Sequence, residues 1–290
     1  MKQISDPGEF QRLCQVYRSQ GLSIGLVPTM GALHSGHGEL IKAARKRSDV
    51  VVLSIFVNPL QFDNSNDLVN YPVTLQADLE FASSLGVDVV FLPSRDQMHP
   101  EPVMIRVEVG KIAEILEGKS RPGHFSGVAT VVAKLFILAG ECEAYFGEKD
   151  FQQLAIISRM VDEMHFPVEI AGVPIVRDSD GLALSSRNLR LSKDQKKAAL
   201  ALSRALFSAK AVISDGLRDV SSVESVMVTE LKRPIAGVSK ADYPVLDYAL
   251  VVDQATLIRP DRIDRPVRLV IAAWVGDVRL IDNLGIDISH

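Results

Sequence analysis

Apolar and polar positions in the first two-thirds of the chain alternate between strand-like and helix-like stretches. The predicted strands are residues 22–27, 50–57, 87–92, 144–146 and 168–173, and the predicted helices are residues 39–47, 71–85, 128–139 and 151–164. The run at 50–57 is almost continuously apolar, as expected of a strand that is buried on both faces. Strands separated by helix-length segments indicate parallel βαβ units, so the sequence predicts a doubly wound, Rossmann-like α/β sheet.

The pattern changes in the last third of the chain. Two long helical patterns come first, at residues 193–214 and 220–231, and short apolar or alternating runs follow at residues 246–252, 267–274 and 278–281. Helices followed by short strands indicate a smaller α+β domain. We therefore predict two domains, residues 1–176 and residues 177–290.

Composition and charge narrow the class of protein. The chain has 290 residues and a formal net charge of −4, which argues against a nucleic-acid partner because such proteins usually carry a strong basic excess. No apolar run approaches the ~18 residues that cross a bilayer, and the N-terminus lacks a signal-peptide core. Two cysteines are too few for a zinc site or a disulfide framework. These features predict a cytoplasmic protein that binds neither membrane nor nucleic acid.

The segment with the most chemical information is residues 28–40, PTMGALHSGHGEL, which lies where the first strand gives way to a helix. A helix N-terminus at this place offers free N–H groups and a positive dipole end to a phosphate. Gly31 and Gly36 allow a close backbone approach, and His34 and His37 would share one helix face. Two such imidazoles can stabilise charge in a phosphoryl displacement. Taken alone, His-x-Gly-His is more often a turn with two solvent-facing histidines.

Five further segments carry a family pattern together with this one. They are residues 56–62 (FVNPLQF), 120–127 (SRPGHFSG), 146–153 (FGEKDFQQ), 180–188 (DGLALSSRN) and 279–283 (RLIDN). In order and spacing the chain resembles the pantothenate synthetase family of the nucleotidyltransferase superfamily, which carries the His-x-Gly-His signature. Residues 28–40 are not a Walker A loop, because this segment does not end in Gly-Lys-Ser/Thr.

The resemblance implies a ligase reaction in two steps on the pathway to coenzyme A. Pantoate attacks the α-phosphorus of ATP and gives an acyl-adenylate, pantoyl-adenylate, and pyrophosphate. β-Alanine then attacks the acyl carbon and gives pantothenate and AMP. The first step needs Mg²⁺ on the leaving pyrophosphate, and the second is largely a matter of positioning. The family also implies a homodimer.

Site residues follow from the resemblance, position by position. The implied ATP contacts are Met30, Gly31, Ala32, Leu33, His34, Ser35, Gly36, His37, Gly147, Glu148, Lys149, Asp150, Val176, Leu184, Ser185, Ser186 and Arg187. The implied catalytic residues are His34, His37 and Lys149, with His37 as the proton donor, and the implied pantoate contacts are Gln61 and Gln153. The metal ligands stay unassigned. Because Leu184 to Arg187 belong to the second domain, we expect that domain to close as a lid when ATP binds.

Several positions depart from the family pattern or leave their role open. Ser35, Gly38, Asp63 and Val73 stand where the family commonly has Glu, Leu, Gly and Arg. Arg121 and His124 either cover the acid substrate or belong to a structural turn. Two other functions are considered: a nucleotidyltransferase that uses the same motif on a phosphorylated substrate, and a non-catalytic ATP-binding relative. The paired glutamines, the second domain and the retained histidines favour the ligase.

Overall fold

The structure is a computed structural model that describes residues 1–62 and 68–288. The chain forms two compact units, Met1–Pro174 and Ile175–His290. The division lies two residues before the boundary expected from the sequence, and it places Val176 in the second unit. Asp63, one of the departures from the family pattern, lies outside the described residues.

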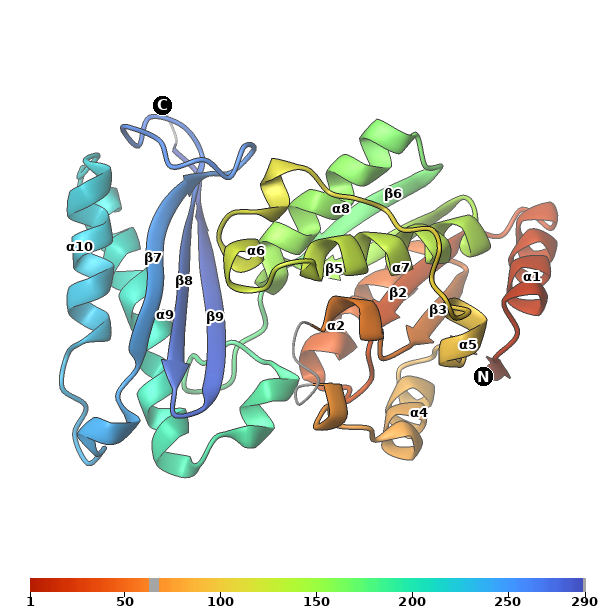
Figure 1. The fold of residues 1–290 in the computed structure, drawn as a ribbon, viewed down its shortest axis with the longest axis horizontal. Coiled ribbons are helices and arrows are strands. Elements are labelled where there is room, and N and C mark those ends of the chain that lie inside the picture. The colour runs from red at the N-terminus through yellow and green to blue at the C-terminus, as the bar shows by residue number, and fades with distance from the viewer. Residues whose placement is uncertain (63–67, 289–290) are drawn as a thin grey trace. The chain divides into compact units, whose positions relative to one another are not determined.

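A six-stranded sheet forms the centre of the first unit (Figure 1). Its strands are β1 Lys2–Ile4, β2 Ile24–Thr29, β3 Val50–Ile55, β4 Val89–Phe91, β5 Cys142–Gly147 and β6 Val168–Val173. Their order is β1-β4-β3-β2-β5-β6, and every neighbouring pair is parallel. This arrangement confirms the predicted doubly wound sheet.

Helices cover both faces of this sheet. They are α1 Pro7–Ser19, α2 Ser35–Arg47, α4 Leu75–Ser84, α5 Arg95–Met98, α6 Glu117–Ser120, α7 His124–Ala139 and α8 Phe151–Met164. Short 3₁₀ turns at Pro59–Gln61, Lys111–Ala113 and Glu148–Asp150 lie between them. The residues of α1, α7 and α8 share one core with the sheet, and those of α2 and α4 share the other.

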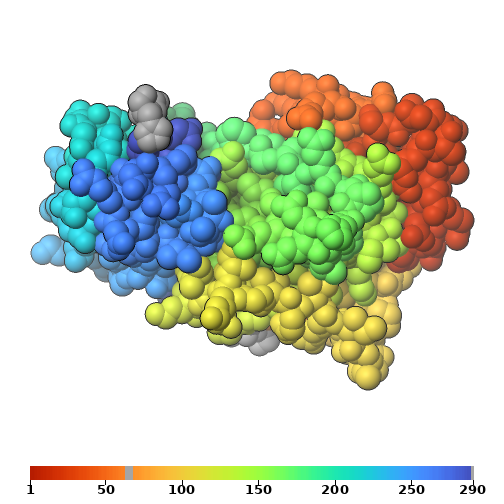
Figure 2. All heavy atoms as spheres, turned by 90° about the horizontal axis from the view of Figure 1, so that it is seen from above, coloured from red at the N-terminus to blue at the C-terminus, as the bar shows by residue number. Residues whose placement is uncertain are grey.

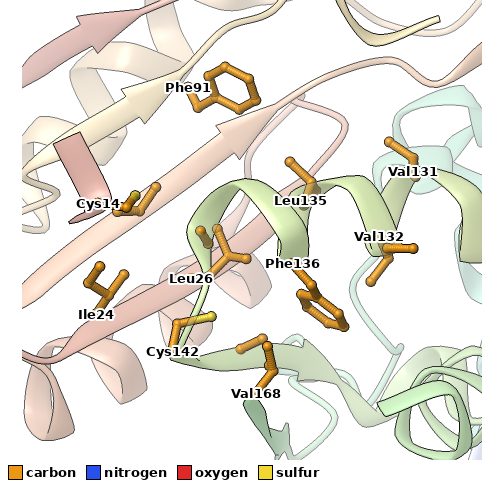
Figure 3. Packing of buried hydrophobic residues seen from close by; sticks show 14 of the residues in the cluster. Cys14, Ile24, Leu26, Phe91, Val131, Val132, Leu135, Phe136, Cys142 and Val168 are labelled. Carbon is orange, nitrogen blue, oxygen red and sulfur yellow. The ribbon is translucent and has the colours of Figure 1, made fainter. Parts of the chain in front are cut away.

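The alternation of side chains along the strands explains the two cores. In β3, Val50 and Val52 belong to the core under α7, whereas Val51 and Leu53 belong to the core under α2. Successive side chains of a strand point to opposite faces, so a strand in the middle of this sheet must be apolar throughout. Figure 3 shows part of the first core, with Phe136 of α7 among its labelled side chains.

Several predicted boundaries differ from the structure, and three of the differences have identifiable physical reasons. The first predicted strand, β2, continues beyond residue 27 through Pro28, where a proline is tolerated because pairing with β5 is confined to Gly25 and Leu26. Helix α2 begins four residues earlier than predicted, because two histidines cap it in place of the usual small polar residues. Helix α4 begins at Leu75 rather than at residue 71, after the Pro72 that disfavours helix in the residue before it.

The second unit has a three-stranded antiparallel sheet in the order β7-β8-β9. The strands are β7 Val245–Asp253, β8 Val267–Val275 and β9 Val278–Ile286, the helices are α9 Lys193–Ser214 and α10 Val220–Leu231, and 3₁₀ turns lie at Ser186–Arg190 and Lys240–Asp242. Both helices contribute to one apolar core with the sheet. This unit confirms the predicted smaller α+β fold, with both long helices at their predicted bounds.

Candidate active site

The predicted phosphate segments meet at the point where the strand order of the first unit reverses. The chain runs from β2 outward to β3 and β4 on one side, and then returns to place β5 and β6 on the other side of β2. Ligands of doubly wound sheets bind beyond the carboxyl ends of the strands at such a switch point. Residues 30–37 follow β2, and the 3₁₀ turn Glu148–Asp150 follows β5. The fold therefore brings together the two segments that the sequence singled out.

His34 and His37 cap the N-terminus of α2. The Nδ1 atom of His34 accepts from the backbone N–H of Gly36 at 3.1 Å, and Nδ1 of His37 accepts from the N–H of His34 at 3.3 Å. The two ring centroids are 4.1 Å apart. A neutral imidazole that accepts at Nδ1 carries its proton on Nε2. Each histidine is thereby fixed as an Nε2–H donor beside a positive helix end, as a phosphate site requires.

Charge and burial keep both imidazoles neutral. Burial lowers the pKa of His37 to about 3, with a further lowering by His34 and an opposing effect of Asp150. Burial also lowers the pKa of His34, helped by Lys149 and opposed by Asp150. Lys149 forms an ion pair with Asp150 at 3.8 Å, and its side chain is only 17 % exposed. The Lys149 cation therefore lies close enough to the two neutral N–H donors, His34 and His37, to act on the same bound group.

Asp78 fixes the backbone between β2 and His34, a role that the sequence did not reveal. Its carboxylate accepts from the N–H of Ala32 at 3.0 Å and of Leu33 at 2.8 Å, and from the hydroxyl of Thr74 at 3.1 Å. Asp78 is only 3 % exposed, although an aspartate within a predicted helix would ordinarily be expected to face solvent. Ala32 has a φ of +49°, which is unfavourable for a residue with a side chain. The buried carboxylate holds this unusual loop conformation in place.

Gln61 lies at the end of the 3₁₀ turn after β3, and its amide is oriented by Asn58. The Asn58 amide nitrogen donates to the carbonyl of Gly127 and to Oε1 of Gln61, both at 3.0 Å. Since Oε1 of Gln61 accepts, its amide nitrogen faces the other way, toward Sδ of Met30 at 3.1 Å. Gln61 is therefore presented as an N–H donor next to Met30, one of the predicted ATP contacts.

Arg121 and His124 hold the backbone of the same glutamine. Nδ1 of His124 donates to the carbonyl oxygen of Gln61 at 2.7 Å, and Arg121 donates to that oxygen at 3.2 Å. The remaining His124 nitrogen, Nε2, lies 3.2 Å from Arg121 Nη1 and accepts from it. In this structure the two residues contact Gln61 itself, an arrangement that neither of the two sequence-based alternatives included.

Gln153 lies in the first turn of α8. Its neighbour Gln152 holds the segment of residues 112–117 through three hydrogen bonds. The Gln152 amide nitrogen donates to the carbonyls of Ile112 and Ile115 at 2.7 and 2.8 Å, and its oxygen accepts from the N–H of Glu117 at 2.9 Å. In Figure 2 this yellow segment lies against the green stretch that includes α8. Gln152 is thus a structural anchor and is only 5 % exposed, whereas the sequence placed it in a family segment without giving it a role.

The remaining predicted ATP contacts lie in the second unit. The Leu184 N–H donates to the carbonyl of Val176 at 2.9 Å, which makes these two residues partners in a tight hairpin. Ser185 caps the following 3₁₀ turn, where its hydroxyl accepts from the N–H of Arg187 at 3.3 Å. Arg177 anchors the hairpin through two hydrogen bonds to the buried carboxylate of Asp282, at 2.6 and 2.9 Å. Asp282 belongs to the C-terminal segment that carried the family pattern without an assigned role.

The structure explains one departure from the family pattern. A Cβ atom added at Gly38 would lie 3.1 Å from Cζ of Phe81 and 3.4 Å from a Leu85 methyl, so a larger residue here would require the Phe81 side chain to shift. Ser35 is exposed at the first position of α2, and Val73 is exposed ahead of α4. Nothing in the structure explains the residue types at these last two positions.

Buried histidines predict a specific loss of stability in acid. Burial lowers the pKa of His99 and His124 to about 4 and that of His37 to about 3, each from 6.5. Between pH 6.5 and 4 the unfolded chain binds protons that the native chain does not. The free energy of unfolding should therefore fall on acidification by up to about 1.4 kcal/mol per pH unit for each histidine. Urea unfolding at pH 7, 6 and 5 measures this slope. His99→Gln should reduce this slope, because one of the histidines with a lowered pKa is gone. An unchanged slope in that variant would contradict the lowered pKa of His99.

The family model that matches the chain is described as pantoate-beta-alanine ligase, and it spans residues 2–285. A pantothenate synthetase of Ruminiclostridium cellulolyticum is 44% identical over 283 residues, which cover 98% of each chain. A pantothenate synthetase of a Geobacter species is 47% identical over 269 residues, covering 93% of this chain and 94% of the relative.

Solved structures show the same likeness. The crystal structure of pantothenate synthetase from Thermus thermophilus matches with a TM-score of 0.88 at 41% identity, over 98% of this chain and 99% of that one. Pantoate-beta-alanine ligase from Francisella tularensis, complexed with beta-gamma ATP and beta-alanine, matches with a TM-score of 0.80 at 36% identity. That match covers 98% of this chain and 97% of the other.

Proposed function

Because the chain belongs to the pantoate-beta-alanine ligase family, we propose that it condenses pantoate with β-alanine through a pantoyl-adenylate formed at the ends of β2 and β5. As a member of that family the chain is an ATP-dependent ligase of pantothenate biosynthesis. The observation that carries the proposal is the fixed pair of Nε2–H donors, His34 and His37, beside Lys149.

In the first step a carboxylate oxygen of pantoate attacks the α-phosphorus of ATP, and the bond to pyrophosphate breaks. Negative charge builds on the phosphate oxygens during this displacement. His34 and His37 donate to those oxygens from Nε2, and Lys149 supplies a positive charge. Donors that are already oriented need no reorganisation when the charge appears, which makes their stabilisation of the transition state effective. Mg²⁺ enters with ATP as part of the substrate, because phosphate oxygens are the hard ligands it prefers.

In the second step the amine of β-alanine attacks the acyl carbon, and the bond from that carbon to the AMP oxygen breaks. We propose that the amide nitrogen of Gln61, whose orientation Asn58 supports, donates to an oxygen of the pantoyl group, and that Gln153 supplies the second contact expected from the family pattern. The rate of this step depends mainly on holding the amine against the activated carbonyl. AMP leaves with one oxygen that came from the pantoate carboxylate.

The origin of that oxygen gives a direct test of the intermediate. Pantoate labelled with ¹⁸O in its carboxylate, incubated with ATP and β-alanine, should yield AMP that carries one ¹⁸O atom in each turnover. Mass spectrometry of the nucleotide and phosphate products measures the label. A label found in inorganic phosphate together with ADP would mean an acyl-phosphate intermediate and would overturn the adenylate. Unlabelled AMP would mean that the carboxylate does not attack phosphorus.

We propose that Val176 and residues 184–187 contact ATP, and that ATP binding closes the second unit.

We also propose that the protein is a homodimer in the cytoplasm. The large exposed apolar side chains Met104 and Ile105 are compatible with a subunit contact. Sedimentation velocity would decide the assembly, since a monomer at micromolar concentration contradicts the dimer. No described helix is both long and apolar enough to cross a membrane.

A further inference from the structure

His99 is a buried histidine without a role in the proposed reaction. It follows α5, is only 1 % exposed, and its ring centroid lies 5.7 Å from that of Phe56. Its Nε2 atom lies 3.0 Å from Oδ1 of Asn58, and Nδ1 has no hydrogen-bond partner among the described residues. A buried ring with one nitrogen unsatisfied is costly, so an apolar side chain would serve better if the position were only structural.

The directions of the hydrogen bonds around Asn58 can be assigned from two fixed groups. The carbonyl of Gly127 can only accept, so the amide nitrogen of Asn58 must face it. The backbone N–H of Leu60 can only donate, so Oδ1 of Asn58 must face that group, at 3.3 Å. His99 meets the same Oδ1 atom and must therefore donate from Nε2. The orientation of Asn58 then requires that Oε1, and not the amide nitrogen, of Gln61 face it.

We propose that His99 is a positioning residue for the acid substrate, which acts through Asn58 to keep the amide nitrogen of Gln61 directed toward pantoate. This inference rests on the proposed contact between Gln61 and pantoate. Each member of the chain His99–Asn58–Gln61 donates to the next oxygen in one direction, from Nε2 of His99 to Oδ1 of Asn58 and from the Asn58 amide to Oε1 of Gln61. Reversal of either amide would set two N–H groups, or two oxygens, against each other.

The surroundings of His99 keep its ring neutral, which is the form that the hydrogen bonds from His99 through Asn58 to Gln61 require. Its backbone N–H donates to the carbonyl of Arg95 at 2.6 Å, and Lys134 donates to the carbonyl of Met98, which holds the end of α5 in place. Burial, followed by the charges of Lys134, Arg106 and Arg95, lowers the pKa of His99 to about 4, and Glu101 opposes this. The ring is therefore neutral at pH 7 and has a single proton, which lies on Nε2.

The test compares two replacements of equal length, His99→Gln and His99→Met. Glutamine can still donate an N–H toward Asn58, whereas methionine cannot. Loss of one orienting hydrogen bond leaves Gln61 in the competent orientation for a smaller fraction of the time, and the apparent affinity falls in proportion. We expect His99→Met to raise KM for pantoate about tenfold, with KM for ATP within about twofold of the original chain, and His99→Gln to restore most of the affinity.

A control variant separates this role from simple loss of packing. Met98→Ala removes a buried side chain next to His99 and leaves the amide chain intact. It should lower the melting temperature and change KM for pantoate by less than about twofold. An equal rise in KM for His99→Met and Met98→Ala would overturn the proposal. If His99→Met does not fold, His99→Leu provides a second non-donor of a different shape for the same comparison.

A double-mutant cycle distinguishes failure of this inference from failure of the proposed function. Gln61→Met removes the amide and should itself raise KM for pantoate. On that background, His99→Met should have no further effect, because the group that it positions is gone. No effect of Gln61→Met would contradict the proposed role of Gln61. An effect of Gln61→Met together with a normal KM in His99→Met, or additive effects in the double variant, would contradict only the role of His99.

Discussion

Replacement of His37 with asparagine should reduce the rate of pantothenate formation about 10²- to 10³-fold, the usual consequence of losing one oriented donor to a charged transition state. The amide oxygen of asparagine can take the place of Nδ1 and still accept from the N–H of His34, so the helix cap is kept. What is lost is the Nε2–H group. Steady-state kinetics with all three substrates, under saturating ATP, measures the effect on kcat.

Two comparisons make this result specific. His37→Gln keeps an N–H group near the position of Nε2 and should lose much less activity than His37→Asn. His165→Asn is the matched surface control, because His165 is exposed and has a positive φ of 55°, which asparagine tolerates well. It should be fully active. Similar kcat values for His37→Asn and the original chain would show that the His37 donor is not needed.

Replacement of Asp78 with alanine should have the second-largest effect, on both stability and activity. The change leaves the N–H groups of Ala32 and Leu33 without their acceptor in a buried place, which should lower the free energy of unfolding by about 3 kcal/mol. The loop that leads to His34 would then lose its fixed conformation. We expect a rise in KM for ATP of at least about tenfold, measured together with urea unfolding.

The same helix offers a control for Asp78. Glu80 is exposed and pairs only with Gln76 among the contacts described for it, so Glu80→Ala should change the free energy of unfolding by less than about 0.5 kcal/mol. Asp78→Asn should be intermediate, because a single amide oxygen can serve only one of the two N–H groups well. Unchanged stability and unchanged ATP affinity in Asp78→Ala would contradict the proposed role of Asp78 in holding the loop before His34.

The elements predicted best from the sequence were those in which one pattern dominates. Strand β6 and helices α8, α9 and α10 have the predicted bounds, because long periodic runs end at clear breaks. Boundaries failed where another interaction replaced the usual signal. Imidazoles cap α2 in the absence of serine or aspartate, and the pairing of β2 with β5 stops early enough to admit Pro28. Strand β1 and helix α1 were not predicted.

The site was predictable where a motif names its residues, and unpredictable where a side chain acts through another. Gln61 was recognised from its segment, but the hydrogen bonds that orient it come from residues 58, 99, 121 and 124, which meet only in the fold. No role for Asp78 was evident from the sequence, because helical periodicity does not distinguish a buried carboxylate that binds backbone N–H groups from one that faces water. Such positioning residues can be identified only once the structure shows which groups they contact.

The most direct test of the central claim is exchange of labelled pyrophosphate into ATP in the absence of β-alanine. If the chain forms pantoyl-adenylate at the site of His34 and His37, exchange should require pantoate and magnesium, and His37→Asn should slow it about as much as it slows the full reaction. Exchange that proceeds without pantoate, or that is unaffected in His37→Asn, would contradict this account of the site. Absence of exchange in a preparation that makes pantothenate would contradict a freely reversible adenylation before β-alanine binds.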